Sequence, residues 1–122
     1  MIDIDGLIAL QAASYRRASG ALSEAWPESS AMDAAELGAF LDAKRYCVFA
    51  TTRADGHAEA RPVAFVVLGT SLWFATVAGG RLTNLRRTPW ASVVIEDGEG
   101  DNHRAVVVDG PIAIVASPPP EA

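Results

Sequence analysis

The chain has 122 residues, of which half are hydrophobic, and its formal net charge is −5 at pH 7. This length predicts a single domain with a substantial core, and the acidic balance argues against general nucleic-acid binding. No apolar run reaches the roughly 20 residues that span a membrane, and the acidic start MIDIDGLIAL is unlike a signal peptide. One cysteine excludes an internal disulfide. We therefore expect a protein of the reducing cytoplasm, without a membrane or nucleic-acid partner.

Two helices are predicted before any strand. Residues 4–19 carry an apolar stripe at helical spacing. Residues 20–31 predict a linker, in which Trp26 either docks on the domain or is exposed. A second helix is predicted from Asp33, because Glu36 three residues on completes a capping box. The predicted organisation is an N-terminal helix and linker at 1–31, the main domain at 32–116 and a proline-rich tail at 117–122.

The pattern then changes to strands. Residues 45–53 predict the first strand, the turn signal Ala54-Asp55-Gly56 predicts a hairpin, and residues 59–68 predict the second strand. Cys47 lies in the middle of the first strand, where we expect a buried and unreactive thiol.

The stretch LWFATVAGGRLTNLRRTP, residues 72–89, is the best candidate for a binding site. Its first six residues predict a third strand, Gly79-Gly80 predicts a turn, and a short helix with three arginines follows. Free N–H groups at a helix N-terminus and a nearby guanidinium favour a phosphate. The alternative is a simple strand-to-helix turn with solvated arginines. The stretch is not a Walker A loop, because no Gly-Lys-Ser/Thr follows.

Residues 91–96 and 104–116 predict the fourth and fifth strands, the last one bent at Gly110-Pro111. These strands are apolar on both faces, as the run VAFVVL at 63–68 shows. One face can fill a small barrel, but the two predicted helices are too short to cover the other. This pattern predicts a homodimer packed through the outside of the barrel, and a well-covered monomer is the alternative.

The order of these pieces resembles the pyridoxamine-phosphate-oxidase-like, FMN-binding split-barrel family. The resemblance covers about residues 33–116 and implies a mainly β fold, an antiparallel split barrel of six strands. It also implies a dimer with one flavin in each of two grooves between the subunits. The pieces that carry it are FATTRADG (49–56), EARPVAFVV (59–67), LWFAT (72–76), GRLTNLRRTPWASVVIED (80–97) and AVVVDGPIAIV (105–115).

The resemblance also assigns residues to an FMN site. By position, Arg61 would reach the phosphate or the ribityl chain, and Arg81 would pair with the phosphate. The residues expected along the isoalloxazine ring are Pro62, Val63 and Ala64, and those expected near the ribityl and phosphate region are Ala75 and Thr76.

Two departures from the family pattern matter. Many flavin-binding members have a lysine after the arginine, where this chain has Leu82, so FMN affinity is expected to fall unless Arg86 or Arg87 compensates. The family also usually continues past the fifth strand into another helix and a last strand, so we expect either that the barrel is completed differently here or that the sequence is shortened.

The expected function is an FMN-binding, flavin-dependent oxidoreductase with a small-molecule substrate. The alternatives are an F420-dependent reductase of the same fold and a cofactor-free dimer without enzymatic activity; a haem-binding relative and an anion-binding module are weaker. The catalytic residues stay unassigned, because Glu59 and His57 are explained as solvated side chains. No metal site is expected, since His57 and His103 lack metal-ligand spacing and are predicted at the surface.

Overall fold

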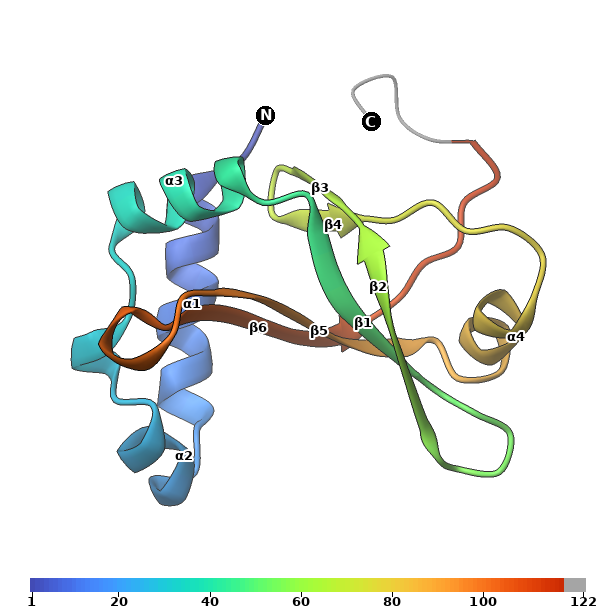
Figure 1. Cartoon of the computed structure of the whole chain (residues 1–122), viewed down its shortest axis with the longest axis horizontal. Coiled ribbons are helices and arrows are strands. Elements are labelled where there is room, and N and C mark those ends of the chain that lie inside the picture. The colour runs from blue at the N-terminus through green and yellow to red at the C-terminus, as the bar shows by residue number, and fades with distance from the viewer. Residues whose placement is uncertain (118–122) are drawn as a thin grey trace. The chain divides into compact units, whose positions relative to one another are not determined.

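The computed structural model describes residues 1–117 of the chain (Figure 1). They fall into two compact units, the first made of residues 1–43 and 67–72 and the second of residues 44–66 and those from 73 onward. The predicted boundary near residue 31 stays a prediction. All of the predicted proline-rich tail except Ser117 lies outside the described residues.

Helices make up most of the first unit (Figure 1). They are α1 (Ile4–Arg17), α2 (Gly20–Ala25), a short 3-10 helix (Glu28–Ser30) and α3 (Ala34–Ala43). The prediction of a linker at 20–31 is therefore wrong for its first half. Ser19 caps α2, because its Oγ accepts a hydrogen bond from the Leu22 N–H at 3.1 Å. Trp26 follows this helix with 45% of its surface exposed.

The start of α3 confirms the predicted capping box. The Glu36 N–H donates to Asp33 Oδ1 at 2.8 Å, and the Asp33 N–H donates to Glu36 Oε1 at 3.1 Å. This exchange satisfies two N–H groups that a helix leaves without partners at its first turn. The helix buries three apolar side chains, Leu37, Phe40 and Leu41. None of the described helices is both long and apolar enough to cross a membrane.

The second unit is built on a four-stranded antiparallel sheet with the order β2-β1-β5-β6. Its strands are β1 (Tyr46–Thr52), β2 (Ala58–Ala64), β5 (Trp90–Asp97) and β6 (Arg104–Pro111), and α4 (Gly80–Arg87) precedes β5. Two short strands, β3 (Val66–Leu68) and β4 (Ser71–Trp73), form a separate two-stranded sheet, most of which belongs to the first unit. Antiparallel sheets with flanking helices confirm the predicted fold class, although the strands described here form no closed barrel.

Three predicted strands end earlier than expected, each because its pairing partner ends. The second breaks after Ala64, since Ala64 is paired with the first residue of β1. The third stops at Trp73, because β4 has only the three-residue β3 as a partner. The fifth stops at Pro111, which is paired with the first residue of β5. Residues 74–77, expected as part of a strand, therefore form a connection that leads to α4.

The sheet of the second unit has one buried face and one exposed face. Cys47 and Phe49 alternate on β1 with Tyr46 and Val48, and the first pair is 4% and 2% exposed whereas the second pair is 68% and 42% exposed. The buried position of Cys47 confirms its predicted burial, and this burial raises the pKa of the thiol. The exposed face also carries a large apolar side chain on β5, Trp90, and another on β6, Val107.

The connection between β5 and β6 depends on a glycine. Gly98 has a φ of +77°, and a Cβ at this position would collide with the carbonyl group of Asn102. A side chain is therefore excluded there both by backbone conformation and by space.

Candidate functional site

The first backbone N–H groups of α4 have no capping side chain among the described residues. Gly79 is the N-cap residue, and within residues 1–117 no side chain caps the first turn of the helix. A helix leaves its first N–H groups without acceptors of its own, and its dipole makes this end positive. Apart from the adjacent residues and the backbone of the helix itself, a side-chain Cβ at Gly79 or Gly80 would have no described atom within 4 Å, so there is open space beside the backbone at both positions.

Arg81 lies in this first turn, and one hydrogen bond from its guanidinium to Thr76 orients the side chain. Its Nε donates to Thr76 Oγ1 at 3.3 Å, and the side chain is half-buried. This contact uses Nε and leaves the two Nη groups for another acceptor. The structure therefore brings two of the predicted site residues together, Thr76 and Arg81, although Thr76 lies in the connection after β4 and not in a strand.

Aromatic packing fixes the connection that carries Thr76. The Phe74 ring meets the Phe49 ring edge-on, with 4.6 Å between centroids and 64° between planes. Phe49 is buried at the centre of β1, and its register partner on β2 is Arg61. The Arg61 side chain is exposed, and its Nη1 donates to the carbonyl of the neighbouring Ala60 at 2.8 Å. Arg61 thus lies on β2 next to Phe49 of β1, the residue whose ring contacts Phe74.

The remaining predicted contacts are divided between the two faces of β2. The Val63 side chain is buried in the core, whereas Pro62 and Ala64 point to the exposed face. Ala75 is exposed in the connection after β4, and Leu82 is half-buried in α4. The assignment of these residues to flavin contacts stays a prediction.

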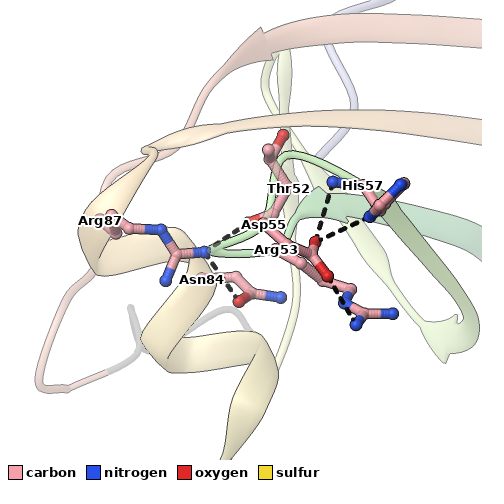
Figure 2. A network of polar contacts seen from close by, with 6 residues as sticks. All are labelled: Thr52, Arg53, Asp55, His57, Asn84 and Arg87. Atoms are coloured by element: carbon pink, nitrogen blue, oxygen red, sulfur yellow. Dashed lines mark hydrogen bonds and ion pairs between the residues drawn. The ribbon is translucent and has the colours of Figure 1, made fainter.

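A network of polar contacts attaches the other end of α4 to β1 (Figure 2). Asn84 Nδ2 donates to Thr51 Oγ1 at 3.1 Å, and Arg87 Nη2 donates to both the Thr52 carbonyl at 2.7 Å and Asn84 Oδ1 at 3.0 Å. Sequence reasoning missed Asn84, although an asparagine in the middle of a short helix is a poor helix former and so signals another role.

Among the described residues of this unit, three cations form ion pairs with carboxylates and five arginines do not. Lys44 and Arg104 pair with Asp97, and Arg53 pairs with Asp55. Within the described part of the chain, no carboxylate pairs with Arg45, Arg61, Arg81, Arg86 or Arg87. Three of these five arginines lie on α4, so this helix carries uncompensated positive charge in a chain of net negative charge.

Both histidines lie at the surface, as predicted, and both contact carboxylates. His57 Nδ1 lies 3.2 Å from Asp55 Oδ1 at the β1–β2 hairpin, and His103 Nε2 lies 2.8 Å from Glu96 Oε2. Hydrogen bonds from the His57 backbone N–H and then from its ring lower the pKa of Asp55. The described residues contain no group of three metal-ligating side chains that could hold a metal ion.

Comparison with protein-family models assigns the chain to a family. A family model described as pyridoxamine 5'-phosphate oxidase matches residues 33–122, about three quarters of the chain. The chain belongs to the pyridoxamine 5'-phosphate oxidase family. No curated protein sequence gives a significant match.

Three crystal structures share the fold of this family member. A conserved hypothetical protein from Mycobacterium tuberculosis is 29% identical with a TM-score of 0.65, and the match covers 72% of this chain and 56% of that one. An FAD-binding protein from Mesorhizobium loti is 27% identical with a TM-score of 0.56, covering 66% and 59% of the two chains. The haem storage protein HutZ from Vibrio cholerae is 16% identical with a TM-score of 0.60, covering 71% and 66%. The chain thus spans little more than half the length of the first of these proteins.

Proposed function

We propose that this protein binds FMN and works as a flavin-dependent oxidoreductase on a small molecule. Membership of the pyridoxamine 5'-phosphate oxidase family supports this function, and so does the FAD-binding relative of 27% identity. The observation that carries the proposal is the turn into α4, where Arg81 is held through Nε by Thr76 beside uncapped backbone N–H groups. This donor set has the chemistry that a phosphate monoester needs.

Each residue then has a stated role. The two Nη groups of Arg81 and the first N–H groups of α4 bind the phosphate, and Thr76 orients the guanidinium. Arg61 extends the positive charge toward the phosphate or the ribityl chain. The ring is expected to lie along Pro62, Val63 and Ala64, with Ala75 close to the ribityl chain. When bound, the flavin supplies the hydride or electron transfer, and the protein supplies orientation and shelter from water.

We also propose that the functional unit is a homodimer. The exposed face of the β2-β1-β5-β6 sheet carries large apolar side chains on three of its strands, namely Tyr46, Val48, Trp90 and Val107. A sheet face with several large exposed apolar side chains is unusual on a monomer and is typical of a subunit interface. A second copy of this chain has the same face to offer, so the pairing is self-complementary.

A titration of the purified protein with FMN and with riboflavin tests the proposed function. FMN should bind and quench in fluorescence, and riboflavin, which lacks the phosphate, should bind poorly. Arg81→Ala should weaken FMN binding by about 2 kcal/mol and leave riboflavin binding nearly unchanged, because it removes a charged hydrogen-bond partner of the phosphate. Arg17→Ala, which removes an arginine at the far end of α1, is the control for net charge.

The outcomes separate the alternatives. Equal losses for FMN and riboflavin in Arg81→Ala would show that the arginine supports the fold and not the phosphate. Binding of F420 but not FMN would assign the protein to the deazaflavin-dependent reductases. Absence of binding for all three compounds would favour a cofactor-free dimer.

A further inference from the structure

Helix α4 has little of its own to keep it in place. It has eight residues, about two turns, and it starts with a glycine. Isolated helices of this length are not stable in water, so α4 depends on what it is attached to. Its apolar anchor is Leu85, which is 4% exposed.

The polar attachment comes from Asn84 and Arg87. Asn84 is 7% exposed, and its amide uses Nδ2 to reach Thr51, itself 4% exposed, and Oδ1 to accept from Arg87. The same Arg87 Nη2 also donates to the Thr52 carbonyl at 2.7 Å. Two side chains of one helical turn therefore bind two consecutive residues at the end of β1. Figure 2 shows the contacts of Arg87 with Thr52 and Asn84.

We propose that Asn84 and Arg87 form a polar clamp that positions the N-terminal turn of α4. Arg87 is then a positioning residue that acts through Arg81, and it is not a phosphate ligand. Arg81 lies six residues before Arg87, about 9 Å along a helix that rises 1.5 Å per residue, so a shift at the clamp displaces the phosphate-binding turn. This inference rests on the proposed function for the ligand, but the clamp itself can be tested without one.

The chain offers a matched control in the adjacent arginine. Arg86 and Arg87 both lie in the last turn of α4, so each contributes the same charge to the helix dipole. Arg86 is exposed, and no described residue gives it a hydrogen bond or an ion pair. Arg86→Ala therefore removes the charge alone, whereas Arg87→Ala removes the charge together with the clamp.

The first experiment compares flavin affinity in the two variants. Arg87→Ala should raise the Kd for FMN about tenfold, because misplacing a charged donor loses most of one hydrogen bond. Arg86→Ala should change it less than about twofold, as expected for a screened surface charge. Riboflavin should bind both variants as it binds the unaltered protein.

In an Arg81→Ala background, Arg87→Ala should have little further effect, since the residue through which it acts is gone. Equal effects of Arg86→Ala and Arg87→Ala on FMN, or full additivity with Arg81→Ala, would overturn the positioning role.

The second experiment is hydrogen exchange in the absence of flavin. The amides of α4 should exchange faster in Arg87→Ala than in Arg86→Ala, while the amides of β5 keep their protection. Asn84→Ala should resemble Arg87→Ala in this measurement. Unchanged protection of α4 in Arg87→Ala would overturn the clamp, whatever the protein binds. If α4 exchanges faster in Arg87→Ala as expected but the unaltered protein binds no flavin, the clamp is retained and the proposed function is rejected.

Discussion

Val48 of β1 and Val94 of β5 are register partners on the face of the sheet that is open to solvent. The apolar surface continues on both sides of this pair, to Tyr46 on β1 and to Val107 on β6. The same face also carries two polar residues, Ser92 on β5 and Asp109 on β6. They are bonded to each other, because Ser92 Oγ donates to Asp109 Oδ1. This face can therefore be buried without leaving that hydroxyl unpaired.

We expect the chain to sediment at twice its mass of 12.8 kDa at low micromolar concentration. Val107→Glu places a charge on the exposed sheet face and should shift the protein toward the monomer. Leu10→Glu is the matched control, because Leu10 is 52% exposed and Val107 is 51% exposed, but Leu10 lies on α1. Analytical ultracentrifugation measures both. A soluble monomer in the unaltered protein would contradict the proposed interface.

Leu82→Lys should tighten FMN binding about tenfold, because it adds a charged partner next to the phosphate-binding Arg81. Riboflavin should not distinguish the variant from the unaltered protein. Thr83→Lys adds the same charge on the following, exposed position of α4 and should have a much smaller effect. Fluorescence titration of the three proteins measures the difference, and equal gains for both lysines would indicate general electrostatic attraction.

Asp33→Ala should lower the free energy of unfolding by about 0.5–2 kcal/mol, because α3 loses the side chain that caps its first turn. The Asp33 and Glu36 hydrogen bonds are both local to this turn, so flavin affinity should stay the same. Urea denaturation gives the first quantity and titration the second. A variant as stable as the unaltered protein would show that the capping box contributes nothing in solution.

Asp97 should make the stability of the second unit sensitive to acid. Its hydrogen bond from Lys44, with a further contribution from Arg104, holds its pKa below the usual 3.8. A lowered pKa in the folded state means that the unfolded state binds the proton first, so stability is lost as the pH falls. The cost of Asp97→Asn in the free energy of unfolding should therefore be constant from pH 7 to about 5 and shrink below about 4. Asp101→Asn, in the exposed turn after β5, is the control, and a cost for Asp97→Asn that does not vary with pH would reject the assignment.

Features that depend on neighbours in the sequence were predictable. The capping box of α3 needs only four residues, and the hairpin at Ala54-Asp55-Gly56 needs only a turn in which glycine has a positive φ, here +87°. The burial of Cys47 followed from its place in an apolar strand. In each case the physical cause lies within a short segment, so the sequence contains it.

Features that depend on contacts between residues far apart in the sequence were not predictable. Residues 72–77 have the composition of a strand, but a strand needs a ladder partner, and β3 offers only three residues. The hydrogen bond from Asn84 to Thr51 joins residues 33 positions apart, and no local pattern pairs them. The bond between Thr76 and Arg81 lies between these cases, because the two residues are close in sequence but Thr76 lies in a connection that also packs on β1 through the Phe74 and Phe49 rings.

Glycine has opposite uses at two places in this protein. At Gly98 the fold demands it, whereas at Gly79 and Gly80 the fold has room for a side chain. In a mutational scan that records cellular abundance and flavin retention separately, Gly98→Ala should lose both signals. Gly79→Ala and Gly80→Ala should keep abundance, and alanine at the helical position should even raise it, since alanine is the better helix former. If these two variants nevertheless lose flavin, the space left at the turn is reserved for a molecule that is not part of the chain.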